Sequence, residues 1–434
     1  MQNTVFSAAL VKGNLAAGWA VGLIVAAALA LAAFGVLAPA VAHAHAPGSR
    51  ALGAGYPQQC PEPYPPTRDP ANPLDLPAPP GPDPLAGARF FVPGPAHGAA
   101  AGAIAQLVGL DPKAMANDES WAAFAQSLQS GPLAAKLAAN PRLAHQVAEL
   151  SKIAAQPEAQ RFSIYSYGGG PGGIFKQAEK IFCSNMTADP GSIPVINTYF
   201  LHPALGGCPT ARQISSYGPT FRRRVGEMAA ATDRRPAVYL LELDAVGSSS
   251  CILRKGGGAA WAGALRFEMT ALQALPHTVV YVEGGYSDAN SVGYVAKLLN
   301  SAGIGKIRGF FTNDTHENWT SSEVRWDTRI SRLTHGAHFI VNTAQNGRGP
   351  LLNPHPSTQG PENLCNPPGR GLGIPDTTST GSQSADAFMW THPPGNSSGC
   401  GGGPPGGVFW PARAVQLAQN ANDQLGPGLP GHPY

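Results

Sequence analysis

Short apolar runs rich in β-branched and aromatic residues alternate along this chain with longer segments of helical spacing. The clearest run is AVYLLEL, from Ala237 to Leu243, which is too continuously apolar for a strand with one solvated face. Further strands are expected at 88–92, 161–167, 192–200, 278–282, 307–312, 337–343 and 387–390. Helices are expected at 121–155, interrupted near Pro132 and Pro141, and at 259–275, 292–301 and 321–334. This alternation predicts a parallel sheet, and the number of strand–helix units favours an α/β barrel over an open sheet.

The first 46 residues have the composition of an export signal. Lys12 supplies a positive charge, residues 16–41 are almost continuously apolar, and Ala42-His43-Ala44 is a small-residue cleavage site. The apolar run is also long enough to span a bilayer, so a retained membrane anchor is the alternative. In both cases we expect the rest of the chain to be extracellular, either secreted or held by that anchor.

Residues 47–83 are rich in proline and cannot form a core, so we interpret them as a stiff, extended linker. The folded domain is expected to span residues 84–434. The net charge of +3 is too small and too scattered to suggest nucleic-acid binding. We expect a monomer.

All six cysteines lie beyond the N-terminal apolar segment, and none belongs to a C-x-x-C pair. This pattern predicts three disulfides and no metal site, and it allows fifteen pairings.

In parallel barrels, reactive side chains lie where strands end and loops begin. Asp244 ends one predicted strand, Glu283 ends the next, and Asn313 and Asp314 follow the one after. Aromatic side chains occur nearby, at Tyr286, Trp319 and Trp390. Such a set suits glycosidic cleavage, which needs one carboxyl to protonate the leaving oxygen and usually another to activate water. Taken alone, an aspartate after a strand more often caps a loop or a helix.

Seven motifs, in order, resemble those of glycoside hydrolase family six, the family of endoglucanases and cellobiohydrolases that act on β-1,4-glucan. The most specific is CNPPGRGLG, from Cys365. The others are PLAGARFFV from Pro84, LELDAVG from Leu241, YVEGGY from Tyr281, RGFFTN from Arg308, HFIVNTAQNG from His338 and DAFMWTHPPG from Asp386. The chain is therefore identified as a diverged member of that family from about Pro84 to about Asn422.

The resemblance implies a distorted, incomplete parallel β/α barrel of about seven strands, similar to a TIM barrel. It also implies an inverting mechanism that needs no metal or cofactor. It implies the disulfides Cys208–Cys251 and Cys365–Cys400, and it leaves Cys60 and Cys183 as the remaining pair.

Site residues also follow from the resemblance. Asp244 takes the place of the family's proton donor. The positions implied to contact substrate are Glu242, Phe200, Tyr286, Asn313, Trp390, His392 and Asn396. Two carboxylates of the family pattern are replaced, one by Gly207 and the other by Ser398. Glu283, at the end of the neighbouring strand, is the expected substitute that activates water, with His392 or another group as alternatives.

Two functions fit this pattern. The first is a secreted glucanase that cleaves β-1,4-linked glucan or a related polysaccharide, with Asp244 as the acid. The second is a catalytically impaired relative that binds glycan or acts at the cell surface. Retention of Glu242 and Asp244 favours the hydrolase, because a decayed site has no need of the acid.

Overall fold

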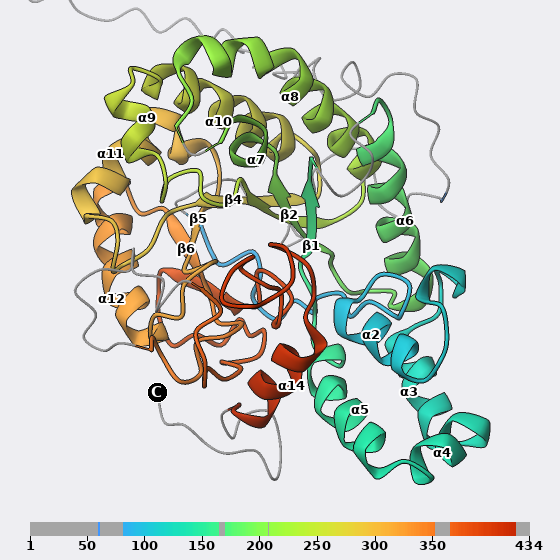
Figure 1. Cartoon of the computed structure of the whole chain (residues 1–434). Helices are drawn as coiled ribbons and strands as arrows, with labels where there is room; N and C mark the ends of the chain where they lie inside the picture. Colours follow the sequence, from blue (N-terminus) through green and yellow to red (C-terminus); the bar gives the residue numbers. More distant parts are fainter. Residues whose placement is uncertain (1–59, 61–80, 165–169, 207, 352–364, 422–434) are drawn as a thin grey trace, which may run out of the picture. The chain divides into compact units, whose positions relative to one another are not determined.

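The computed structural model describes residues 60, 81–164, 170–206, 208–351 and 365–421. Seven parallel strands form one sheet in the order β1-β2-β3-β4-β5-β6-β7, and the sheet curls into a half-barrel surrounded by helices (Figure 1). The strands are β1 (Gln160–Ser163), β2 (Val195–Tyr199), β3 (Ala237–Leu241), β4 (Thr278–Glu283), β5 (Gly309–Thr312), β6 (His338–Asn342) and β7 (Ala385–Met389). The predicted barrel fold is confirmed.

Helices connect successive strands, and further helices precede β1 and follow β7. They are α2 (Ala99–Leu107), α3 (Trp121–Gln129), α4 (Gly131–Ala138), α5 (Pro141–Ala154), α6 (Gly173–Ala188), α7 (Leu201–Leu205), α8 (Ala211–Thr232), α9 (Ser250–Arg254), α10 (Gly258–Gln273), α11 (Val292–Ala302), α12 (Thr320–Leu333) and α14 (Pro411–Gln419), with short 3-10 turns η2 (Pro112–Ala114) and η3 (Ile304–Lys306). Pro132 and Pro141 lie in the first turns of α4 and α5, where a missing N–H costs no helical hydrogen bond.

One expected strand, at 88–92, is reduced to a single bridge between Phe90 and Ile193. Pro93 follows this segment directly, and proline has no N–H to continue a ladder. The expected strand at 161–167 begins one residue earlier and ends at Ser163, and residues 165–169 lie outside the described part.

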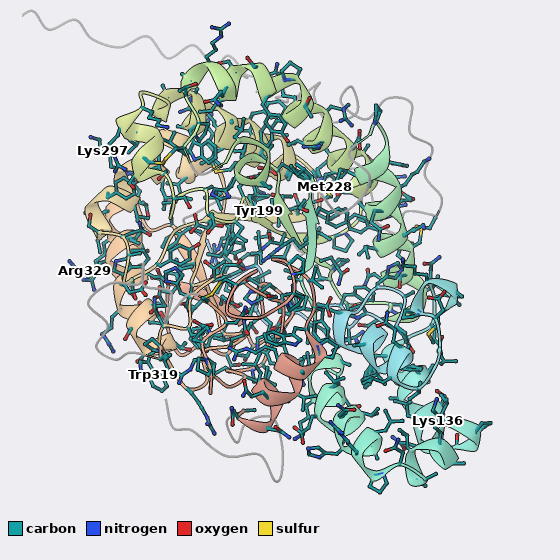
Figure 2. All side chains as sticks on the ribbon, viewed as in Figure 1. Lys136, Tyr199, Met228, Lys297, Trp319 and Arg329 are labelled. Carbon is teal, nitrogen blue, oxygen red and sulfur yellow. A yellow bond between two sulfur atoms is a disulfide. The ribbon has the colours of Figure 1, made fainter. Side chains whose placement is uncertain are left out.

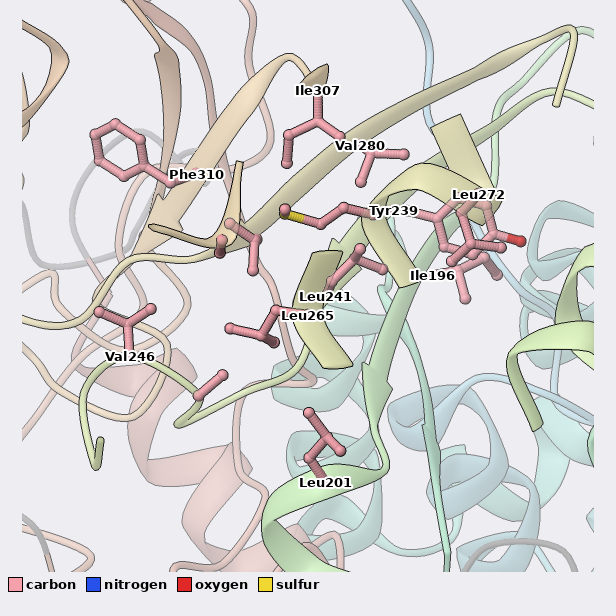
Figure 3. Close-up of a cluster of buried hydrophobic side chains, with 14 of the residues drawn as sticks. Ile196, Leu201, Tyr239, Leu241, Val246, Leu265, Leu272, Val280, Ile307 and Phe310 are labelled. Carbon is pink, nitrogen blue, oxygen red and sulfur yellow. The ribbon is translucent and has the colours of Figure 1, made fainter. Parts of the chain in front are cut away.

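The sheet is buried on both faces, as the continuous apolar runs predict. Tyr239 and Leu241 of β3 face the outer helices and pack with residues such as Leu265 of α10 (Figure 3). Val238 and Leu240 face the other way and join side chains from β4 to β7 in a second cluster. Because side chains alternate along a strand, this second cluster fills the inside of the half-barrel. A third cluster packs α2 and α5 against α14.

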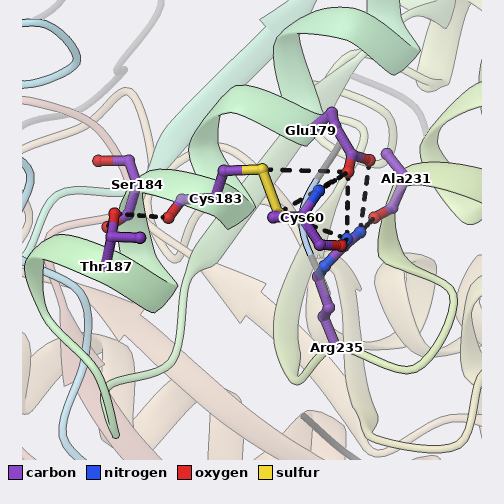
Figure 4. The surroundings of a disulfide bond; sticks show 7 residues. All are labelled: Cys60, Glu179, Cys183, Ser184, Thr187, Ala231 and Arg235. Carbon is purple, nitrogen blue, oxygen red and sulfur yellow. Dashed lines mark hydrogen bonds and ion pairs between the residues drawn. A yellow bond between two sulfur atoms is a disulfide. The ribbon is translucent and has the colours of Figure 1, made fainter. Parts of the chain in front are cut away.

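All six cysteines form disulfides, in the pairs Cys60–Cys183, Cys208–Cys251 and Cys365–Cys400. The pairings implied by the family resemblance are therefore confirmed. The Cys60–Cys183 bond is reinforced by buried charges (Figure 4). The Arg235 guanidinium donates to the Cys60 carbonyl oxygen at 2.6 Å and to the Glu179 carboxylate at 3.1 Å. Cys60 is thus fastened to α6 and to the residues that lead into β3.

Residues 1–46 and nearly all of 47–83 lie outside the described part, so the export segment and the linker remain predictions. Among the described residues, no helix is both long and apolar enough to cross a membrane.

The double variant Cys60→Ser/Cys183→Ser is expected to lose about 2–5 kcal/mol of unfolding free energy, because it frees the largest disulfide loop of the unfolded chain. The sequence separation is 123 residues for this bond and 35 for Cys365–Cys400. Urea unfolding at neutral pH measures the loss. Cys365→Ser/Cys400→Ser is the matched control and should lose less. An equal or larger loss in the control would contradict the prediction.

Candidate active site

A cleft of about 1350 Å³ opens where the strands end. Each strand contributes a lining residue at or just beyond its carboxyl end, namely Ser163, Tyr199, Asp244, Tyr286, Asp314, Gln345 and His392. Tyr199 lies near the middle of the molecule in Figure 2. The carboxyl ends of parallel strands are the usual location of reactive groups in α/β barrels, so this cleft is the candidate active site.

Asp244 lies on a tight turn directly after β3. Glu242 and Asp244 have φ values of 55° and 63°, in the left-handed region that residues other than glycine rarely adopt. The Asp244 carboxylate accepts hydrogen bonds from the hydroxyls of Tyr286, at 2.6 Å, and Tyr199, at 3.2 Å. Burial and the nearby Asp244 charge raise the pKa of both tyrosines, which therefore stay protonated as donors. The turn presents an acid to the cleft in a fixed orientation.

The Glu283 side chain stabilises this turn by accepting hydrogen bonds from its backbone. This side chain is fully buried, and its two oxygens accept the N–H groups of Val246 at 2.5 Å, Gly247 at 3.0 Å and Gly285 at 2.6 Å. Burial and the neighbouring Asp244 raise the pKa of Glu283 to about 8, although the three backbone donors act in the opposite direction. Glu283 does not line the cleft, so this geometry does not favour its expected role in activating water.

Gly247 lets the turn approach Tyr286 closely. A Cβ atom at position 247 would lie 2.3 Å from the Tyr286 ring, which is far inside van der Waals contact. The tyrosine ring can therefore pack directly against the turn that carries Asp244. The tyrosine ring also stacks on the ring of His316, with centroids 3.8 Å apart. The Nδ1 atom of His316 in turn lies 3.0 Å from Asp288.

A second group of polar side chains crosses the barrel mouth. Arg161 of β1 donates to Asp314, just beyond β5, at 3.0 Å, and the Thr391 hydroxyl donates to the other Asp314 oxygen. Burial alone would raise the pKa of Asp314, but Arg161, His392 and Thr391 together lower it below its usual range. Asp314 is therefore a buried, ionised carboxylate on the cleft wall.

His392 lies beside this carboxylate. Its Nε2 atom is 3.0 Å from the amide nitrogen of Gln345, which can only donate, so Nε2 accepts. The other ring nitrogen, Nδ1, faces Asp314 Oδ1 at 3.7 Å. The Asp314 charge thus orients the imidazole ring at the cleft wall.

Four of the residues predicted from the sequence line the cleft. They are Asp244, Tyr286, His392 and Asn396. Ser398, which replaces a family carboxylate, lines it as well, while Gly207 lies outside the described residues.

The other predicted site residues are buried behind the cleft wall. The Glu242 carboxylate accepts the N–H groups of Phe200 at 2.9 Å and Leu201 at 2.7 Å, and so holds the start of α7. Phe200 itself is fully buried in the core between sheet and helices. These residues support the wall from behind and are not placed to touch a ligand, because neither lines the cleft.

Asn313 and Trp390 are likewise structural in this arrangement. The Asn313 side chain donates to the carbonyl oxygens of Asn318 and Asn342, at 3.1 and 3.0 Å. Trp390 is 1% exposed, and its indole N–H donates to the Ile374 carbonyl oxygen at 3.0 Å. Neither residue lines the cleft.

Several cleft residues have no counterpart among the expected site residues. They are Glu158, Arg161, Tyr199, Asp314, His316 and Glu317. A signal existed for Asp314, since it follows a predicted strand directly. Tyr199 is the last residue of β2, and Phe200, which follows it, is the N-cap of α7. The tyrosine one residue before the predicted position therefore brings its side chain to the cleft.

The fold and cleft define an α/β-barrel protein with a candidate site at the carboxyl ends of its strands. Residues 225–421 match the family model described as glycosyl hydrolases family 6. Endoglucanase A of Thermobispora bispora is 30% identical over 289 residues, which are 66% of this chain and 59% of that protein. Endoglucanase 1 of Streptomyces sp. (strain KSM-9) is 31% identical over 276 residues, which are 62% of this chain and 70% of that protein.

A solved structure agrees with these relatives. The endoglucanase Cel6 of Mycobacterium tuberculosis, in complex with methyl-cellobiosyl-4-deoxy-4-thio-β-D-cellobioside, superposes with a TM-score of 0.57 at 27% identity. The match covers 78% of this chain and 99% of that one. The chain belongs to glycosyl hydrolases family 6, a family of glycosidases.

The buried carboxyls of this region predict a pH-dependent stability. Burial and the adjacent Glu242 raise the pKa of Glu268, on α10, well above the usual 4.5. The folded state therefore keeps a proton there that the unfolded chain releases, and this contribution is complete below pH 4.5 and lost as the pH rises toward the folded pKa. We expect unfolding free energy to fall from pH 5 to pH 8, by at most about 1.4 kcal/mol per pH unit for each such group.

Glu268→Gln removes one of these titrations, so its urea unfolding free energy should depend less steeply on pH than that of the wild type. An equally steep dependence in the variant would contradict the predicted role of Glu268.

Proposed function

We propose that this chain is a cellulase-type glycoside hydrolase that cleaves β-1,4-linked glucan or a related polysaccharide with inversion of configuration. Asp244 is the proton donor. The observation that carries the proposal is the placement of this carboxyl on the cleft, at the end of β3, with a tyrosine hydroxyl on each oxygen. The family relatives named endoglucanase, and the cello-oligosaccharide analogue bound by one of them, support the substrate class.

The residues around Asp244 and on the cleft wall have distinct roles in this proposal. Tyr199 and Tyr286 orient the Asp244 carboxyl, while Glu283 and Glu242 fix the backbone on either side of it. His392 and Asn396 lie on the wall and offer polar atoms to sugar hydroxyls. No role in direct substrate contact is assigned to Phe200, Asn313 or Trp390.

Export to an extracellular location is part of the same proposal. Residues 1–46 supply the signal or anchor expected from the sequence, and the three disulfides fit an oxidising compartment. A polymeric substrate such as cellulose would be met there.

The Asp244→Asn variant removes the proton donor but keeps the shape of the side chain. It should release reducing sugar from soluble β-glucans about 10²–10⁴-fold more slowly than the wild type. The anomer released first by the wild type, followed by proton NMR, should be the α form, as inversion at a β-linkage requires. Asp118→Asn, at an exposed residue that does not line the cleft, is the control for charge loss and should retain full activity.

Reducing-sugar release that is equal in Asp244→Asn and wild type would contradict the assigned donor. Glycan binding by a wild-type protein that hydrolyses no glucan would instead support the glycan-binding function, and would refute the hydrolase.

Tyr286→Phe tests the orientation of the donor. Loss of the 2.6 Å hydrogen bond to Asp244 should lower kcat by about 10- to 150-fold, since hydrogen bonds to charged groups contribute about 1.5–3 kcal/mol. KM should change little, because the hydroxyl is engaged with the acid. An unchanged kcat would show that the hydrogen bond is dispensable.

A further inference from the structure

Cleavage with inversion needs a second group that takes a proton from the attacking water. In this chain Ser398 stands where the family resemblance leads one to expect a carboxylate, and a serine hydroxyl is far too weakly basic to replace it. Four carboxyl side chains line the cleft in the described part of the chain: Glu158, Asp244, Asp314 and Glu317. Asp244 is the donor, so the second group is sought among the other three.

Two of these three carboxylates are already engaged. Both oxygens of Glu158 lie within hydrogen-bond distance of the Ala99 N–H, at 3.1 and 2.9 Å, at the start of α2. Asp314 is fully buried and paired with Arg161 and Thr391. Glu158 and Asp314 therefore have fewer lone pairs left for a water molecule than a carboxylate without a protein donor.

Glu317 differs from both. It is 7% exposed and faces the cleft, yet its carboxylate forms no hydrogen bond or ion pair with any residue of the described part. A carboxylate oxygen without a protein donor can accept a hydrogen bond from a water molecule or a ligand. The cleft is the side from which such a partner can arrive.

The loop that carries Glu317 is joined to the proton donor by direct contacts. The Thr315 hydroxyl donates to the Tyr286 hydroxyl at 3.0 Å, and the His316 ring stacks on the Tyr286 ring. The same Tyr286 hydroxyl donates to Asp244. The segment 315–317 after β5 therefore lies on the same side of the cleft as Asp244. Asp288 holds His316 in this segment in place.

The electrostatic surroundings suit a group that exchanges a proton. Burial raises the pKa of Glu317 to about 8, while the positive charges of Arg413 and Arg370 act against this rise and favour the carboxylate form. A base works best when its proton affinity lies near the working pH, whereas a strongly acidic carboxylate takes a proton from water less readily.

We propose that Glu317 is the general base of this site, a role that rests on the proposed glycosidase function. Its carboxylate takes one proton from a water molecule as the water oxygen forms a bond to the anomeric carbon. The bond from that carbon to the leaving oxygen breaks at the same time, and Asp244 gives its proton to the leaving oxygen. The sugar product has the inverted configuration, and one proton has been gained and one lost by the protein.

The test compares the full-length wild type with Glu317→Gln, Glu317→Ala and Asp244→Asn on cello-oligosaccharides and on β-cellotriosyl fluoride, whose leaving group needs no protonation. Glu317→Gln should lose about 10²–10⁴-fold in kcat on both substrates. Asp244→Asn should lose activity mainly on the oligosaccharides. Sodium azide, a nucleophile that needs no base, should restore turnover of the fluoride by Glu317→Ala and give the α-glycosyl azide, identified by mass spectrometry and NMR.

The Glu317→Asp variant keeps a carboxylate and guards against a loss of activity through misfolding, and it should retain more activity than Glu317→Gln. Hydrolysis at the wild-type rate by Glu317→Gln, or a loss in Glu317→Ala that azide does not restore, would overturn the role of Glu317 alone. A wild type that hydrolyses neither substrate would overturn the proposed function itself, and the role of Glu317 with it.

Discussion

The Glu283 carboxylate organises the end of the sheet on which the cleft depends. It accepts three backbone N–H groups, two from the turn after β3 and one from the turn after β4. The turn after β3 contains two non-glycine residues with positive φ, a conformation that local preferences alone would not maintain. The buried Glu283 carboxylate provides the compensating hydrogen bonds. Glu283 does not line the cleft, but by fixing this turn it directs the side chain of Asp244 into it.

The sheet could be predicted from the sequence because its strands are buried on both faces and their apolar runs are continuous. The alternation of Val238 and Leu240 inward with Tyr239 and Leu241 outward then follows from strand geometry. Two cysteine pairs came with the motif resemblance and the third by elimination, and four of the predicted site residues, at strand ends or in the loop after β7, line the cleft.

The rest of the site could not be read from the sequence, for physical reasons. Glu242 and Glu283 stand at strand ends, where a cleft residue is expected. Their carboxylates are instead buried, because the positive-φ turns place backbone N–H groups that these carboxylates accept. Tyr199, the last residue of β2, lines the cleft, whereas Phe200 begins the turn into α7 and is buried in the core. Glu317 depends on a loop whose position is set by stacking between His316 and Tyr286, a contact between segments that no local pattern encodes.

The disulfide between Cys60 and Cys183 has a consequence for the integrity of the chain. Residues 61–80 connect Cys60 to the barrel through the backbone, while the disulfide connects the same residue to α6 through sulfur. A protease that cuts between residues 61 and 80 would therefore not separate what precedes Cys60 from the barrel. The two fragments would stay one covalent molecule until a reductant opened the bond, so shedding of the N-terminal part would require either cleavage before residue 60 or a reducing environment.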